Sequence, residues 1–290
     1  MENAASRPIK KQTNFGMVFR RLIKDPVSTI CMVVILLIIL MAIFAPVIAP
    51  YQYDEMDLTS VLQKPSAAHI CGTDDLGRDI FSRLIYGARN SLLIGIMTTA
   101  IACLVGVPLG LLSGYAGKKT DTIIMRIMDI FQAIPDTLLA ISISAALGLG
   151  LRNCIIAISV GRIPGFARMA RASSLSVAGM EYVEAAKAMD VKQSRILFKH
   201  VLPNSLSPLI VQGTMMVANS ITQSAGLSFI GLGVQPPESE WGCMLAAGRN
   251  FIRSYPHMLI APLIAILILV LSLNLLGDGL RDALDPKLKK

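Results

Sequence analysis

Apolar stretches of about 20 residues recur along the whole chain, and they constrain its fold more than any other feature. A helix of that length crosses the roughly 30 Å hydrocarbon core of a bilayer, because each residue adds about 1.5 Å. The composition agrees, since 53% of the 290 residues are hydrophobic and only 16% are charged, against about 25% charged in ordinary soluble domains. The sequence therefore predicts an all-α membrane protein.

Six such stretches are the predicted transmembrane helices. The fourth is the least apolar, because Arg162, Pro164 and Arg168 interrupt it, and it is assigned partly because the topology requires it. The predicted spans are 27–49, 90–117, 122–148, 153–172, 205–233 and 258–277.

The distribution of Lys and Arg predicts that both chain ends are cytoplasmic, because cytoplasmic loops carry the excess of basic residues. The net charge of +8 fits this topology and an attraction to anionic lipid. No basic patch interleaved with aromatic residues indicates nucleic-acid binding. The expected layout is a cytoplasmic tail (1–25), a first transmembrane helix (26–50), an extracytoplasmic loop (51–88), a five-helix core (89–278) and a cytoplasmic tail (279–290).

A mixed-charge segment separates the fourth and fifth spans. Charged residues in hydrocarbon would each cost several kcal/mol, so this segment is expected in water. Its Ala, Leu and Met residues favour a short helix, and Pro203 is expected to mark the start of the next helix. A short helix tied to the bundle at both ends is an element on which a partner protein can push. The charged residues are Glu184, Lys187, Asp190, Lys192, Arg195 and Lys199.

The triplet Glu184-Ala185-Ala186, followed sixteen residues later by Leu202-Pro203, resembles the EAA loop of ABC importer permeases. Three further blocks, 71–83, 227–237 and 274–286, resemble the peptide/nickel branch of that family. Two positions depart from the family pattern: Asp190 stands where a glycine is usual, and Ser224 where an acidic residue is usual.

The resemblance implies a type I ABC importer permease fold, with six transmembrane helices and a cytoplasmic coupling helix within a loop at about 173–204. It also implies a bacterial inner-membrane location and several partners: a second permease subunit, one or two ABC ATPase subunits and an extracytoplasmic solute-binding protein. The implied cargo is a di- or oligopeptide, with nickel or a nickel chelate as the alternative. The residues expected to couple to the ATPase are Tyr182, Glu184, Ala185, Ala186, Met189, Asp190, Leu202 and Pro203.

The chain has no P-loop, so ATP and Mg²⁺ are expected on the partner ATPase, and no cofactor is expected on this chain. His69, His200 and His257 are dispersed along the sequence and predict no metal site. Cys71 and Cys243 are both predicted outside, so a disulfide between them is conceivable. A proton-coupled secondary transporter and a membrane enzyme are weaker alternatives, because the chain shows neither an inverted repeat nor a converging catalytic set.

Polar residues within the spans are candidates for a translocation path. Asp136 follows the helix-kinking Pro135, and an ionisable group at that depth is a functional candidate. Arg126 and Asp129 share a helix face and are expected to pair; Arg162 has either a packing or a recognition role. Four residues of the fifth span lie within about 20° of one direction and either bond neighbouring helices or line the path. They are Ser205, Gln212, Asn219 and Gln223.

The extracytoplasmic loop is rich in acidic residues. They form either a docking rim for a solute-binding protein or a simple solvated surface. The candidates for docking are Asp54, Asp57, Asp74 and Asp75.

Overall fold

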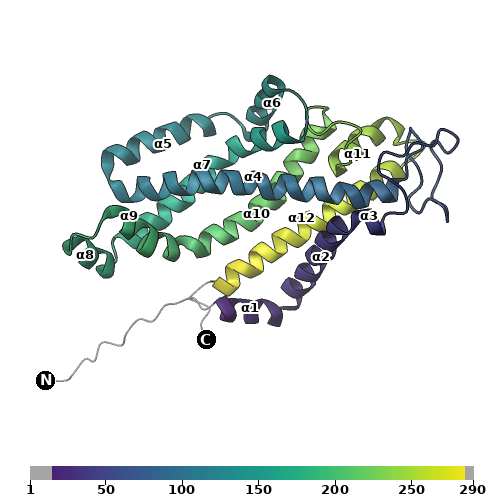
Figure 1. Ribbon diagram of the computed structural model, residues 1–290. Coiled ribbons are helices and arrows are strands. Elements are labelled where there is room, and N and C mark those ends of the chain that lie inside the picture. Colours follow the sequence, from purple (N-terminus) through teal and green to yellow (C-terminus); the bar gives the residue numbers. More distant parts are fainter. Residues whose placement is uncertain (1–14, 285–290) are drawn as a thin grey trace.

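The computed structural model describes residues 15–284, and over this range the chain is helical with no β-strand beyond one isolated bridge (Figure 1). A π-helical turn covers Leu197–Val201 and a 3₁₀ turn covers Arg249–Phe251. The α-helices are α1 (Phe15–Lys24), α2 (Pro26–Ile43), α3 (Ala45–Ile48), α4 (Ile80–Ala116), α5 (Lys118–Gln132), α6 (Asp136–Leu147), α7 (Leu151–Ala178), α8 (Glu181–Ala188), α9 (Gln193–Ile196), α10 (Leu202–Phe229), α11 (Trp241–Gly248) and α12 (His257–Leu284).

Within residues 15–284, α2, α4 and α12 are long and apolar enough to cross a membrane, and α5 with α6 form a fourth candidate bent by 82°. The third predicted span is therefore not one straight helix. Pro135 lies at the break, where its missing N–H and its ring interrupt the hydrogen-bond ladder. Helices α7 and α10 have 28 residues each, so they are long enough to span a membrane. Their composition is not apolar enough to place them among these candidate spans. The count of six spans stays a prediction.

Helices α4 and α7 approach closely because α4 places Gly106, Gly110 and Gly114 on one face. A Cβ atom at Gly106 would lie 2.6 Å from the carbonyl oxygen of Ile163, and one at Gly114 would lie 2.8 Å from that of Arg171. Side chains larger than hydrogen do not fit there. Small residues spaced by four let helices pack closely where lipid supplies no hydrophobic driving force.

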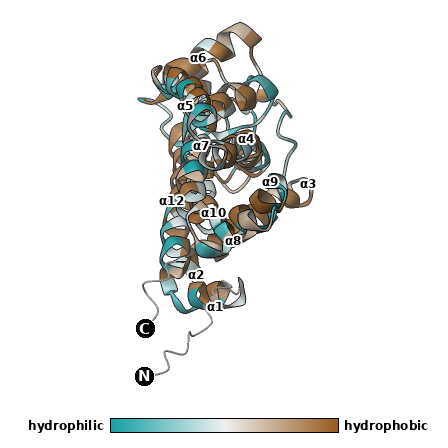
Figure 2. Cartoon of the chain, turned by 90° about the vertical axis from the view of Figure 1, so that its left-hand side faces the viewer, coloured by the Kyte–Doolittle hydropathy of each residue, from teal (hydrophilic) through white to brown (hydrophobic). Residues whose placement is uncertain are grey.

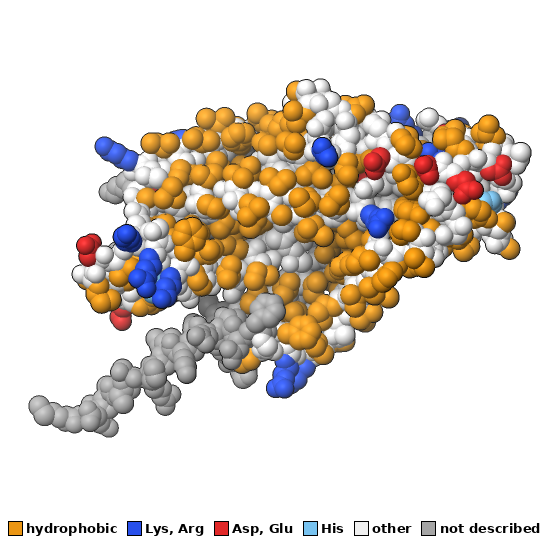
Figure 3. Space-filling model, viewed as in Figure 1, with side chains coloured by type: hydrophobic (Ala, Val, Ile, Leu, Met, Phe, Trp, Pro, Cys, Tyr) orange, Lys and Arg blue, Asp and Glu red, His pale blue; other side chains and the backbone are white. Residues whose placement is uncertain are grey.

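The bundle has two distinct ends. Residues 49–79, called here the long loop, lie with α11 at one end, and residues 179–192, called here the α8 segment, lie at the other (Figure 1). Hydrophobic side chains cover most of the visible middle, and most visible acidic side chains gather at the long-loop end (Figure 3). Seen from the α8 end, hydrophobic residues cover most of the helices, and hydrophilic residues form short patches between them (Figure 2).

The described part of the N-terminal tail is a helix. Val18 and Leu22 of α1 are buried against the end of α12, and the Arg21 side chain donates a hydrogen bond to the carbonyl oxygen of Ala283 at 3.3 Å. This arginine satisfies a carbonyl that the end of α12 leaves without a helical partner. Residues 1–14 and 285–290 of the two predicted tails lie outside the described residues.

At two predicted helix starts the structure has helix earlier than the sequence indicated. Helix α4 begins at Ile80, ten residues before the expected span, because the Asp79 carboxylate caps it by accepting from the Ser82 N–H at 2.7 Å. Pro203 lies in the first turn of α10, as predicted, but helical structure already runs from Gln193 through the π turn into that helix. A π turn just before Pro203 accommodates a residue that cannot donate and whose ring crowds the preceding turn.

Candidate functional site

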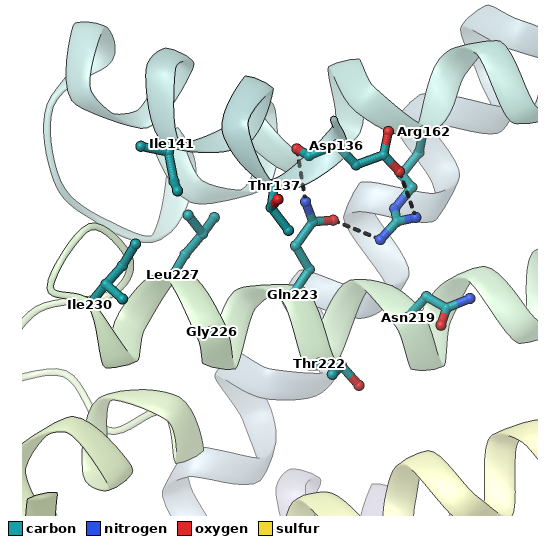
Figure 4. A pocket seen from close by; sticks show the side chains of 10 residues that line it. All are labelled: Asp136, Thr137, Ile141, Arg162, Asn219, Thr222, Gln223, Gly226, Leu227 and Ile230. Carbon is teal, nitrogen blue, oxygen red and sulfur yellow. Dashed lines mark hydrogen bonds and ion pairs between the residues drawn. The ribbon is translucent and has the colours of Figure 1, made fainter. Parts of the chain in front are cut away.

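A cavity of about 530 Å³ lies between α6, α7 and α10. Its polar lining combines a carboxylate, a guanidinium, amides and hydroxyls, while its remaining wall is apolar (Figure 4). Sites that bind small molecules commonly have this composition, with few polar groups on an apolar wall. The lining residues are Asp136, Thr137, Ile141, Arg162, Asn219, Thr222, Gln223, Gly226, Leu227 and Ile230.

Three of these residues form one hydrogen-bonded network across the three helices. Arg162 on α7 pairs with the Asp136 carboxylate at 3.2 Å and donates to the Gln223 side-chain oxygen at 2.6 Å. The Gln223 amide donates in turn to the Asp136 carbonyl oxygen at 3.2 Å. The Arg162 side chain is 15% exposed, and that of Asp136 is 43% exposed. The network therefore joins a half-exposed anion to a largely buried cation.

The predicted pairing of Arg126 with Asp129 is present but long, at 3.9 Å. Asp129 has a closer partner on another helix, because Arg168 of α7 reaches it at 2.7 Å. Arg168 lies six residues after Arg162 and is 50% exposed. It is absent from the cavity lining. Within the part of the chain that the structure describes, helix α7 thus carries three arginine–aspartate pairs: the Arg162 pair inside the cavity, and the Arg168 pair and the pair of Arg171 with Asp121 outside it.

The polar stripe predicted on the fifth span divides in two. Asn219 and Gln223 line the cavity, and Asn219 is exposed on this chain. Ser205 is fully buried and donates to the Val201 carbonyl oxygen at 2.9 Å. Gln212 lies near Gly165 and does not line the cavity. Sequence periodicity placed the four on one face, but it did not show where along that face the cavity opens.

Helix α8 presents an exposed surface at the far end of the bundle. Val183 and Ala186 are buried and anchor the helix, whereas Tyr182 is 42% and Met189 72% exposed. Glu184 and Ala185 are exposed, as are Asp190 and Pro203, and Leu202 is half-buried. No ion pair of Glu184 occurs among the side chains that the structure describes. Exposed apolar side chains on a water-facing helix are typical of an interaction surface.

Asp190 has a φ of +54°, in the left-handed region. The chain therefore turns after α8, and the helix does not continue through Asp190. Asp enters this conformation more readily than most residues. This explains why the position tolerates a residue other than glycine.

The long loop holds its acidic residues in different settings. Asp74 is 5% exposed and accepts from the Arg78 Nε–H at 2.7 Å, so its prediction as part of a docking rim is wrong. Asp54 and Asp57 are exposed and Asp75 is half-buried. Hydrogen bonds from the Ser60 and Thr59 side chains, followed by the Thr59 N–H, lower the pKa of the Asp57 carboxyl.

Cys71 and Cys243 are both free, so the conceivable disulfide between them is not formed. Cys243 is 4% exposed. Burial raises the pKa of its thiol to about 11.

Two family models match the chain. The model described as "Binding-protein-dependent transport system inner membrane component" matches residues 106–290. The model of the "N-terminal TM domain of oligopeptide transport permease C" matches residues 13–65. The chain belongs to the family of binding-protein-dependent transport permeases. It is a non-catalytic, multi-pass inner-membrane subunit of an ABC importer, which works with an ATPase and a binding protein.

Curated relatives resemble the permease over nearly all of its length. The dipeptide transport system permease protein DppC of Alkalihalophilus pseudofirmus is 46% identical, over 93% of this chain and 89% of the relative. The probable D,D-dipeptide transport system permease protein DdpC of Escherichia coli is 44% identical, over 99% and 96%. The glutathione transport system permease protein GsiD of Pectobacterium atrosepticum is 44% identical, over 93% and 90%.

A solved structure shares the fold. A structure of inward-facing conformations of the MetNI methionine ABC transporter matches 71% of this chain and 98% of its own, with a TM-score of 0.59 and 22% identity. The permease therefore has the type I ABC importer permease fold.

Sequence reasoning left Arg162 out of the candidate site, although an arginine within a predicted span is itself a functional signal.

Proposed function

We propose that the permease imports di- or oligopeptides as one half of a heterodimeric translocation path. The relatives reported above are named as dipeptide, D,D-dipeptide and glutathione permeases. Those names favour a peptide over nickel as the cargo. The cavity between α6, α7 and α10 is the segment of the path that this subunit supplies, and its size and mixed lining suit a short peptide.

The observation that carries this proposal is the exposed polar face of α10. Asn219 is exposed on this chain although it lies in the middle of a predicted span. Thr222, one turn later, is also exposed, but its hydroxyl donates to the Ala218 carbonyl oxygen at 3.1 Å, so the Asn219 amide is the informative group. An amide facing lipid would lack hydrogen-bond partners. Asn219 therefore faces either a second permease subunit or a water-filled path between the two. Both arrangements require a partner against this side of α10.

The α8 segment is the site at which the ATPase docks. Its exposed Tyr182 and Met189 provide an apolar surface, and the exposed Glu184 beside them provides charge for a basic residue of the ATPase groove. The buried Val183 and Ala186 transmit the motion, because they belong to the same apolar cluster as residues of α4 and α7. ATP and Mg²⁺ bind to the ATPase, of which the transporter has one or two subunits.

In the proposed orientation of the permease in the membrane, α8 and both chain ends are cytoplasmic. The described ends lie away from the long loop (Figure 1), and the basic residues follow the same division. The long loop then faces the binding protein, with Asp54, Asp57 and Asp75 at the docking surface.

Cysteine substitution at Asn219 tests the path. The complete transporter, with its binding protein, second permease and ATPase, is reconstituted and exposed to a small water-soluble maleimide. We expect Asn219→Cys to be labelled, at a rate that changes between the nucleotide-free and ATP-bound states. Ser205→Cys is the matched control on the same helix and stays protected, because Ser205 is fully buried. Protection of Asn219→Cys in every state, with Asn219→Ala only lowering stability, would contradict the proposal.

A further inference from the structure

We propose that Arg162 and Asp136 are the binding site for the two charged ends of a zwitterionic peptide, and that the Gln223 side chain keeps this site closed when no peptide is present. This inference rests on the proposed function. It adds the chemical groups of the cargo that the path contacts and the residues that contact them.

The guanidinium of Arg162 has an incompletely used hydrogen-bonding edge. One terminal N–H group bonds Asp136 and the other bonds the Gln223 oxygen, while the buried Nε has no partner. A guanidinium binds a carboxylate best through two parallel N–H groups. Gln223 supplies a single oxygen to the edge formed by Nε and its neighbouring terminal nitrogen. A peptide carboxylate that displaces Gln223 satisfies both N–H groups.

Asp136 can receive the opposite end of the peptide. Its side chain is 43% exposed and contacts Arg162 through Oδ2, which leaves Oδ1 for an ammonium group. Arg162 keeps its bond to Asp136 while its other edge changes partner. Four charges of alternating sign then lie together, and none is left unpaired.

Charge balance favours a zwitterion over other ligands. An unpaired charge away from water costs several kcal/mol, and the Asp136–Arg162 pair has no net charge. A free dipeptide also has no net charge and offers a partner to each member of the pair. A dipeptide whose ammonium or carboxylate is blocked leaves one member of the pair without its partner. Each blocked analogue is therefore expected to bind the site more weakly.

Gln223 is suited to the closing role because it is neutral. Its amide bonds both Arg162 and the Asp136 carbonyl oxygen, as Figure 4 shows. The hydrogen bonds that Arg162 donates to a neutral amide oxygen are weaker than those it donates to a carboxylate. The peptide therefore displaces Gln223 readily, and Gln223 closes the site again once the peptide has left.

The test measures binding to the assembled permease–ATPase complex without its binding protein, so that selection by the binding protein does not contribute. Saturation-transfer NMR titrations compare alanyl-alanine with its C-terminal amide. We expect the wild type to prefer the free dipeptide by at least about tenfold, and Arg162→Gln to lose that preference. Arg168→Gln is the matched control and is expected to keep the preference. Arg168 is on α7, like Arg162, but it pairs with Asp129 of α5 outside the cavity.

Arg162→Lys is the substitute variant if Arg162→Gln does not assemble. Lysine retains the positive charge but lacks the planar guanidinium edge that binds a carboxylate through two N–H groups. It is expected to reduce the preference severalfold. Equal binding of the two peptides by the wild type, or an unchanged preference in whichever Arg162 variant assembles, overturns this inference. Dipeptide uptake by wild-type proteoliposomes with the binding protein tests the proposed function separately, so the two failures are distinguishable.

Discussion

The long loop and the α8 segment are built in opposite ways. In the long loop and the start of α4, charged side chains are buried: Asp74 is 5% exposed, while Arg78 and Arg83 are each 2% exposed. In the α8 segment the buried side chains are the apolar Val183 and Ala186. The charged side chains of that segment that the structure describes are exposed: Glu181, Glu184, Asp190 and Lys192.

This difference indicates different tasks for the two ends. A buried ion-pair network has one satisfactory geometry, and removing a partner leaves an uncompensated charge. The long loop is therefore a fixed platform. A helix held by a few apolar contacts, with its charges in water, presents a surface that a partner can bind through many cycles. The α8 segment therefore has the construction that the proposed docking of an ATPase requires.

Replacing Asp74 by Ala is expected to have the largest effect. It removes the acceptor of the Arg78 Nε–H at 2.7 Å and leaves Arg83, whose Nε lies 3.7 Å from the same carboxylate, without that partner. Breaking a buried pair costs about 3–5 kcal/mol. Thermal unfolding of the purified permease in detergent measures the loss. Asp54→Ala, at an exposed position, is the control; equal stability of the two variants would show that the platform is not held by buried charge.

Glu184→Lys is expected to leave the fold intact and to uncouple the transporter. The side chain is exposed, so membrane insertion and thermal stability stay near those of the wild type. Reversing the charge at the ATPase contact lowers peptide transported per ATP hydrolysed by at least about tenfold, equivalent to about 1.4 kcal/mol. Glu55→Lys, an exposed reversal in the long loop, keeps that ratio. Normal transport by Glu184→Lys would remove the assignment of α8.

Substitutions at Asp190 test the turn that ends the α8 segment. At a φ of +54°, Asp190→Gly is expected to change the free energy of unfolding by less than about 0.5 kcal/mol, because glycine adopts this conformation freely. Asp190→Val is expected to cost about 1 kcal/mol or more. Chemical denaturation of the purified permease measures both. A clear loss of stability in Asp190→Gly alone would show that the aspartate side chain is needed there.

Labelling of cysteine thiols is expected to have the smallest effect on function. It should still show a clear contrast in reactivity between the two ends of the bundle. Burial raises the pKa of Cys243 to about 11, so at pH 7–8 almost no reactive thiolate is present. The native thiol should resist maleimide until the protein unfolds. A cysteine introduced at Met189, which is 72% exposed, should react within minutes. Fast labelling of native Cys243 would indicate that the platform opens.

Local sequence signals located the apolar stretches that form α2, α4 and α12, and the α8 helix, because those signals depend on neighbouring residues. Asp190 is an example, since the glycine usual at that position in the family and the readiness of Asp to adopt a left-handed conformation together indicated a turn. Helix starts were harder to predict. The cap provided by Asp79 moved the start of α4, and the π turn let helix continue through Pro203. Both outcomes depend on backbone geometry, which periodicity does not contain.

The sequence alone determined that this chain is a membrane protein with a charged α8 segment between its apolar stretches, because the cost of placing charge in hydrocarbon is large and local. It also determined the family, through blocks of residues that lie in order along the chain. Only the tertiary structure decided which polar residues act together. Asp136, Arg162 and Gln223 are separated by up to 87 residues, and their network exists because the break at Pro135 turns α6 toward α7 and α10.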